Sequence, residues 1–222
     1  ASACLFLEPE PSEDDTIILD YSLLYVNALL DYYKATDDME TLRELKDFAF
    51  SQIDLALEQL DDRYVIVESD RVGWCLLDWN LNLNRQAGAQ GVLLYALKAA
   101  FEIAVILKDL PRKEQFDQLY VNCLNAANET LWDETLGFYV SGADKQVSWA
   151  SQLWMILGGA CEREKALDIL KRLRDYPAEA MVTPYMHHYY IEALISIGER
   201  TRALSVIRDY WGGMVKLGAD TF

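Results

Sequence analysis

The chain has 222 residues, of which 36 are acidic and 20 basic, giving a formal net charge of -16. Hydrophobic residues make up 52% of it, with only 11 glycines and 5 prolines, a composition that excludes disordered and collagen-like chains. So acidic a surface repels phosphate backbones and anionic lipid head groups, and we therefore expect neither nucleic acid nor a membrane as a partner.

Metal and cofactor signals are missing from the sequence. The four cysteines are far apart and form no Cys-x-x-Cys pair, so we predict buried thiols and no zinc knuckle: Cys4, Cys75, Cys123 and Cys161. The two histidines are adjacent, and no glycine-rich phosphate loop is present. The longest apolar run, around 99–107, is interrupted by Glu102, which argues against a transmembrane helix. We expect no metal and no cofactor.

Helical segments of two kinds alternate along the chain. One kind is apolar on nearly every face and the next is charged on one face, as expected of an inner and an outer helix. The predicted pairs are 20–35 with 39–60, 88–107 with 112–131, 149–159 with 163–174, and 184–197 with 200–210. Asp20 or Ser22 is predicted to cap the first helix, and Asp38 the second. The sequence thus predicts an all-α fold of four helical hairpins in two layers.

The inner helices begin at irregular intervals, which fits no fixed repeat and argues against a solenoid of helix pairs. Long inserts account for the irregularity, and two of them, 63–68 and 132–140, are predicted to form short β-hairpins. The pairs Gly158-Gly159 and Gly212-Gly213 are interpreted as turn or helix-end glycines.

Aromatic and acidic residues gather at or just before the starts of the inner helices. In a ring of helices these starts share one end, where aromatic faces could stack on a sugar while polar groups bind its hydroxyls. The simpler interpretations are a tryptophan that plugs the core and an Asp20 that only caps its helix. The candidate carbohydrate-binding residues are Asp20, Trp74, Asp78, Trp79, Tyr185 and His187.

Several of these stretches resemble the catalytic domain of bacterial α-L-rhamnosidases, which are six-hairpin glycosidases. They are LDYSLLYVNALLDYYKATDD, LLDWNLNLNRQAGAQGVLLYALKAAFEIA, SWASQLWMILGG, TPYMHHYYIEALISIGE and IRDYWGGMVKLGADTF. The resemblance implies that residues 1–222 are one incomplete (α/α)6 toroid, belonging to a longer chain with other domains. It also implies hydrolysis of terminal α-L-rhamnosides by an inverting pair of carboxyl groups.

The family's general acid lies in an Asp-rich loop that nothing in residues 1–15 matches, and its base is a Glu after a Thr-x-Trp run, whereas this chain ends at Phe222. The resemblance therefore implies that both catalytic carboxyl groups lie outside this sequence, so that the chain alone is inactive. Asp20 and Trp79 match positions that line the family's sugar pocket. Two alternatives stay open: another six-hairpin glycosidase or lyase, and a non-catalytic helical scaffold.

Overall fold

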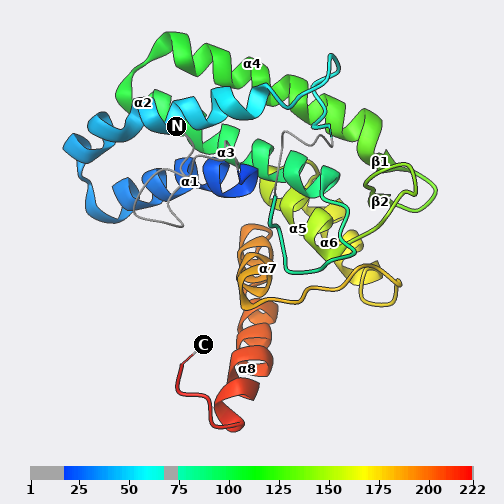
Figure 1. Ribbon diagram of the computed structural model, residues 1–222. Helices are drawn as coiled ribbons and strands as arrows, with labels where there is room; N and C mark the ends of the chain where they lie inside the picture. The colour runs from blue at the N-terminus through cyan, green and yellow to red at the C-terminus, as the bar shows by residue number, and fades with distance from the viewer. Residues whose placement is uncertain (1–17, 68–74, 222) are drawn as a thin grey trace.

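The computed structural model describes residues 18–67 and 75–221, and within them eight α-helices form four consecutive hairpins (Figure 1). The hairpins are α1 (Leu19–Thr36) with α2 (Met39–Leu57), α3 (Gln86–Leu107) with α4 (Leu110–Ala126), α5 (Trp149–Gly158) with α6 (Arg163–Arg172), and α7 (Pro184–Ser196) with α8 (Arg200–Lys216). A π-helical turn, η1 (Ala127–Leu131), extends α4. The prediction of an all-α fold with four helical hairpins is confirmed.

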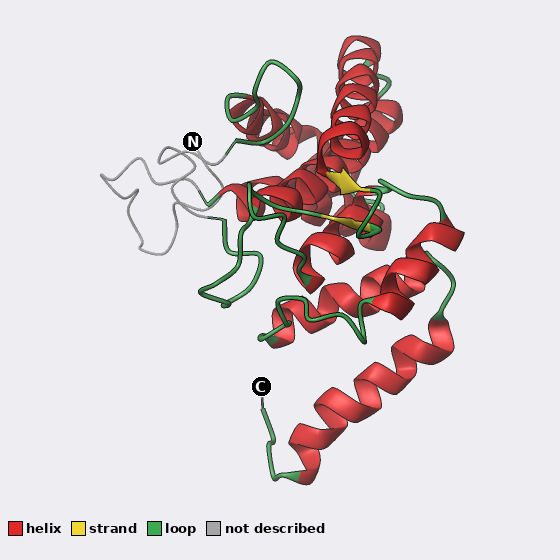
Figure 2. Ribbon diagram, turned by 90° about the vertical axis from the view of Figure 1, so that its right-hand side faces the viewer, coloured by secondary structure: helices red, strands yellow, loops and turns green. Residues whose placement is uncertain are grey.

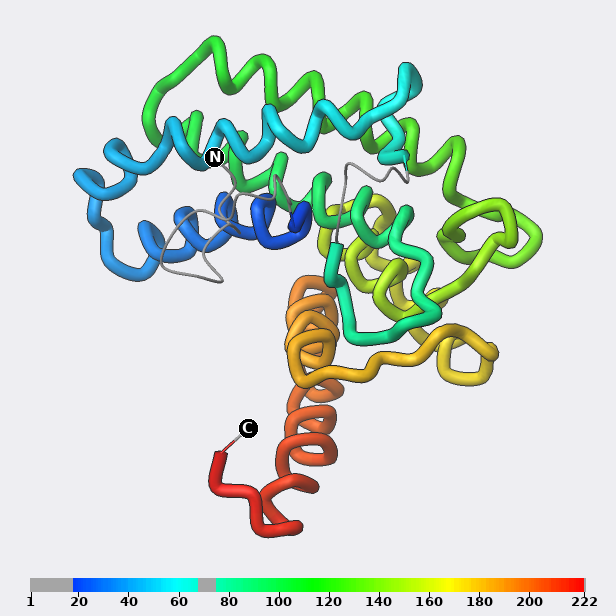
Figure 3. The backbone as a smooth tube through the Cα atoms, in the orientation of Figure 1, coloured from blue at the N-terminus to red at the C-terminus, as the bar shows by residue number. Residues whose placement is uncertain are grey.

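The odd-numbered helices form the inner layer. α3 packs against α1 on one side and α5 on the other, and α5 packs in turn against α7. Their sequences are apolar on most faces because each contacts neighbours on several sides, whereas α2 buries only one face. Figure 3 traces this path along the backbone, and Figure 2 shows α8 at the outer edge, with no described helix beyond it.

Glycines on α3 and α5 let these two inner helices approach each other closely. A Cβ atom built on Gly91 would lie 2.5 Å from the carbonyl carbon of Trp154, and one on Gly158 would lie 2.8 Å from the carbonyl oxygen of Gly91. Any side chain at either position would force the two backbones apart. The absence of side chains here is therefore what seats α5 against the central helix.

Helix α3 also bears on the membrane prediction. By length and composition it could cross a membrane, although the sequence analysis predicted no such helix. In the fold, 61% of its most apolar stretch is buried inside the protein, against α1, α4 and α5. Its hydrophobicity is that of a core helix.

Helix ends agree with the predictions in part. Asp38 caps α2 by accepting hydrogen bonds from the backbone N–H groups of Glu40 and Thr41, as predicted. The predicted cap of α1 was wrong for both Asp20 and Ser22, because the helix begins at Leu19. Its N-cap residue is Ile18, which makes no side-chain cap bond. Gly212-Gly213 was wrongly interpreted as a helix end, since α8 runs through both to Lys216. Gly159 does end α5, with a φ of 81°.

The strands within the inserts are short. β1 (Trp132–Asp133) pairs antiparallel with β2 (Phe138–Tyr139), which confirms the second predicted β-hairpin. The first is reduced to a single bridge between Leu60 and Ile66, and its continuation lies outside the described residues. Cys75 and Cys123 are buried free thiols, as predicted, whereas Cys161 is only partly buried and Cys4 lies outside the described residues.

Candidate active site

The starts of α1 and α7 meet at one end of the molecule, with residues 75–79 between them. The rings of Tyr21 and Tyr185, from the first turns of these helices, lie 6.3 Å apart between centroids. We call this region the rim: residues 20–21, 75–79 and 182–187. It brings together five of the six predicted carbohydrate-binding residues, and the sixth, Trp74, lies outside the described residues.

Asp20 is fully buried in the first turn of α1. Its two carboxylate oxygens accept hydrogen bonds from the backbone N–H groups of Leu76 and Leu77, each at 3.0 Å. Burial raises the pKa of Asp20, and these bonds only partly offset the effect. The side chain thus anchors the loop of residues 75–79 onto α1.

Asp78 makes the matching attachment to α7. Its oxygens accept hydrogen bonds from the backbone N–H groups of Val182 (2.6 Å) and Thr183 (3.0 Å) and from the Thr183 hydroxyl (2.6 Å). That hydroxyl also accepts a bond from the N–H of Met186 and so caps α7. Asp78 is 1% exposed, and its carboxylate is fully engaged with the protein.

Trp79 follows this buried anchor and is itself largely exposed. Its backbone N–H donates to Asp78 at 2.9 Å, while 62% of the residue is exposed. The next residue, Asn80, donates to the Glu179 side chain and to the Ala180 carbonyl oxygen. Trp79 is therefore not a core plug: anchors on both sides hold it at the surface of the rim.

Tyr185 and His187 face different surroundings. The Tyr185 ring lies between those of Tyr21 and Tyr189, and its buried hydroxyl has no hydrogen-bond partner among the described residues. Burial raises the pKa of this hydroxyl strongly. His187 stacks on Tyr210 with centroids 3.7 Å apart, and its Nδ1 lies 2.8 Å from the Thr183 carbonyl oxygen. That oxygen can only accept, so Nδ1 carries a hydrogen, and no hydrogen bond to Nε2 is made by the residues that the structure describes.

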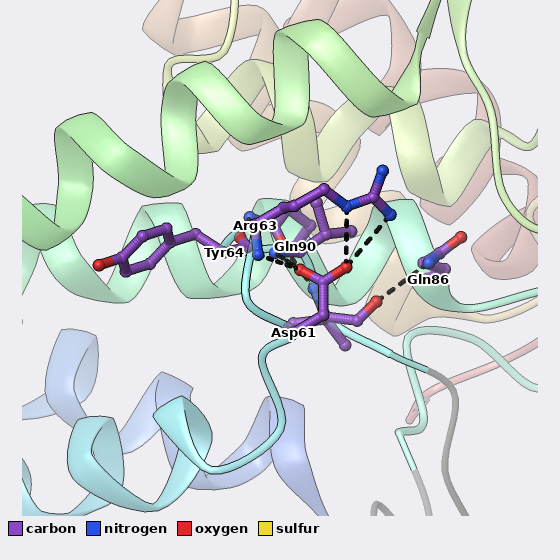
Figure 4. Close-up of polar contacts among 7 residues, drawn as sticks. Asp61, Arg63, Tyr64, Gln86 and Gln90 are labelled. Atoms are coloured by element: carbon purple, nitrogen blue, oxygen red, sulfur yellow. Dashed lines mark hydrogen bonds and ion pairs between the residues drawn. The ribbon is translucent and has the colours of Figure 1, made fainter.

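Two glutamines of α3 that the sequence did not single out hold residues 64–66 in place (Figure 4). Gln90 accepts from the N–H of Ile66 and donates to the carbonyl oxygen of Tyr64, while Gln86 donates to the carbonyl oxygen of Ile66. Asp61 closes the same turn by accepting from the N–H of Val65. Two glutamines four apart in the otherwise apolar first half of α3 were the available signal.

Within residues 18–67 and 75–221 no group of three His, Cys, Asp or Glu side chains is placed to hold a metal ion. The rim offers an exposed indole and a histidine ring, both suited to a neutral polyhydroxylated ligand. Its two carboxylates hold backbone instead of facing outward.

Comparison with known proteins adds to this picture. No family model matches the sequence, and no curated protein does. Among solved structures, the rhamnosidase from Klebsiella oxytoca with rhamnose bound is 43% identical, with a TM-score of 0.91. The chain therefore resembles part of an α-L-rhamnosidase.

The match covers 100% of this chain and 43% of the Klebsiella rhamnosidase chain. A rhamnosidase of Bacillus sp. GL1 from glycosidase family GH78 shares the fold, with 24% identity and a TM-score of 0.81 over 93% of this chain and 22% of that one. A GH63 mannosylglycerate hydrolase from Thermus thermophilus also shares it, with 14% identity and a TM-score of 0.68 over 95% of this chain and 73% of that one. The chain spans less than half the length of the rhamnosidases it matches.

Proposed function

We propose that this chain forms four of the six hairpins of an (α/α)6 glycosidase domain, whose whole hydrolyses terminal α-L-rhamnosides with inversion. The observation that carries the proposal is 43% identity over the whole chain to a rhamnosidase whose structure holds rhamnose. The rim supports it, because its exposed chemistry suits a neutral sugar.

In this proposal the rim supplies sugar contacts and the two buried carboxylates position them. The exposed face of Trp79 stacks on the apolar C–H face of the sugar, and His187 Nε2 binds one of its hydroxyl groups. Asp20 and Asp78 act indirectly: one fixes residues 76–77 on α1, and the other ties Trp79 to the start of α7.

The reaction needs one carboxylic acid to protonate the leaving oxygen and one carboxylate to activate water, roughly 6.5–9.5 Å apart. We assign both to parts of the protein beyond this chain. The support is that each rim carboxylate already accepts hydrogen bonds from the backbone, so neither is free to reach a glycosidic oxygen or a water. This chain alone is then expected to bind the sugar without hydrolysing its glycosides.

Calorimetric titration with L-rhamnose tests this assignment. We expect the wild-type chain to bind L-rhamnose more tightly than D-mannose or L-fucose, and Trp79→Ala to weaken binding at least tenfold. The control is Leu81→Ala, a change at another exposed residue of the same loop, which should leave the affinity unchanged. Equal binding of all three sugars would favour a different six-hairpin glycosidase, and no sugar binding by a folded chain would favour a helical scaffold.

A further inference from the structure

A cavity lies between α1 and α7, beyond the Tyr21–Tyr185 contact of the rim. Its volume is about 330 Å³, and it is lined by residues of α1, α3 and α7. Neither Asp20 nor Asp78 lines it. The polar and aromatic lining residues that matter here are Asn27, Asp31, Tyr95, His188, Tyr189 and Glu192.

Asn27 shows that this cavity is polar and incompletely satisfied. The residue is 9% exposed, and its Nδ2 donates to the carbonyl oxygen of Tyr95 at 3.4 Å, which fixes the orientation of the amide. Its Oδ1 is buried and has no hydrogen-bond partner among the described residues. A buried acceptor without a donor costs free energy, so a donor from outside the described residues is expected there.

Two carboxylates face the same space from opposite helices. Asp31 lies one turn after Asn27 on α1, and Glu192 lies on α7. Both act on Tyr95 between them: burial raises the pKa of its hydroxyl, and the two negative charges raise it further. In the part of the chain that the structure describes, the ion pairs include neither Asp31 nor Glu192.

The cavity therefore presents an unpartnered acceptor and two carboxylates, and neither the hydroxyls of Tyr95 and Tyr189 nor the His188 ring donates to the Asn27 oxygen. From this we infer that it binds a guanidinium group, whose planar fork of N–H donors serves Asn27 Oδ1 and the two carboxylates together. The rings of Tyr95 and Tyr189 give this weakly hydrated cation aromatic walls, which favours guanidinium over a compact, strongly hydrated ammonium ion. The group could come from an arginine of a polypeptide or from a free guanidino compound.

The test is NMR titration of the isotope-labelled 222-residue chain, following the Asn27 side-chain amide signals. Methylguanidinium should shift these signals and bind at least tenfold more tightly than tetramethylammonium, which carries the same charge without N–H donors. Titration with N-acetyl-L-arginine amide separates the two sources. Tighter binding than methylguanidinium indicates a polypeptide arginine, and weaker or equal binding indicates a free compound.

Two variants check the residues. Asp31→Asn combined with Glu192→Gln should weaken methylguanidinium binding at least tenfold, and Asn27→Leu should also weaken it. The control, Glu40→Gln combined with Glu44→Gln, changes the net charge equally on α2 and should leave the affinity within twofold. Equal binding of tetramethylammonium, or equal losses in the control and the double variant, would overturn the assignment.

Discussion

Removal of the Asp78 carboxylate is the sharpest perturbation of the rim, because one buried side chain joins two distant segments. Val182 and Thr183 lie 104 and 105 residues away in sequence. Asp78→Ala leaves their two N–H groups and the Thr183 hydroxyl without this acceptor, and the start of α7 loses its tie to the loop that carries Trp79.

The size of the effect follows from these contacts. An unsatisfied buried donor costs about 1–3 kcal/mol, and hydrogen bonds to charged groups lie at the upper end of the range. Val182 is half exposed, so water can replace part of its bond, and removal of a buried charge recovers part of the desolvation cost. We expect a net loss of about 2–3 kcal/mol, or a fall of about 4–12 °C in Tm for a chain of this size.

Urea unfolding followed by circular dichroism measures this loss. Asp78→Asn keeps one acceptor and should lose about half as much, and the exposed Asp144→Ala should change stability by less than about 0.5 kcal/mol. A double-mutant cycle with Thr183→Val should give a coupling of about 1 kcal/mol. If Asp78→Ala were as stable as the Asp144 control, the anchoring role would be refuted.

Three further predictions concern packing, pH and thiol chemistry. Gly91→Ala should lower the free energy of unfolding in urea by about 2–4 kcal/mol, because the new Cβ meets the α5 backbone. The control Gly213→Ala has open space around it inside α8 and should raise the free energy of unfolding by about 0.5–1 kcal/mol. Equal effects of the two changes would contradict the close contact at Gly91. Because burial raises the pKa of Asp20 in the folded state, its contribution to stability is complete below pH 3.8 and is lost as pH rises through that raised pKa. The stability of wild type relative to Asp20→Asn should therefore fall as the pH rises above 3.8, and a constant difference would contradict this sign. Burial raises the pKa of the Cys123 thiol to about 12, so little reactive thiolate forms in the native chain. Peptide mapping should find Cys123 unlabelled by iodoacetamide at about pH 8 in the native chain and labelled after denaturation. Rapid labelling of the native chain would contradict this burial.

The helical layers were predictable because burial on several sides leaves a direct trace in sequence. α3 carries few charges because α1, α4 and α5 surround it, whereas α2 keeps one charged face. The end of α8 was not predictable in the same way. Each glycine weakens a helix by about 1 kcal/mol without stopping it. Gly212-Gly213 alone therefore does not show where α8 ends, and the helix continues to Lys216.

The site was predictable in its residue types but not in their roles. Sequence places Asp20 and Asp78 among aromatic residues, which fits a sugar contact as well as a structural anchor. The partners that decide between these roles are backbone N–H groups 56 to 105 residues away, and backbone groups leave no residue signature. The unpartnered oxygen of Asn27 was invisible for the same reason, since it depends on how α1 meets α3.

A crystal structure of the chain soaked with L-rhamnose tests the central claim most directly. We predict the sugar at the rim, with its apolar face on Trp79 and a hydroxyl group within hydrogen-bond distance of His187 Nε2. Rhamnose bound away from the rim, for example in the groove of α3 and α4 lined by Phe101 and Tyr120, would contradict the claim, as would an empty rim at saturating sugar.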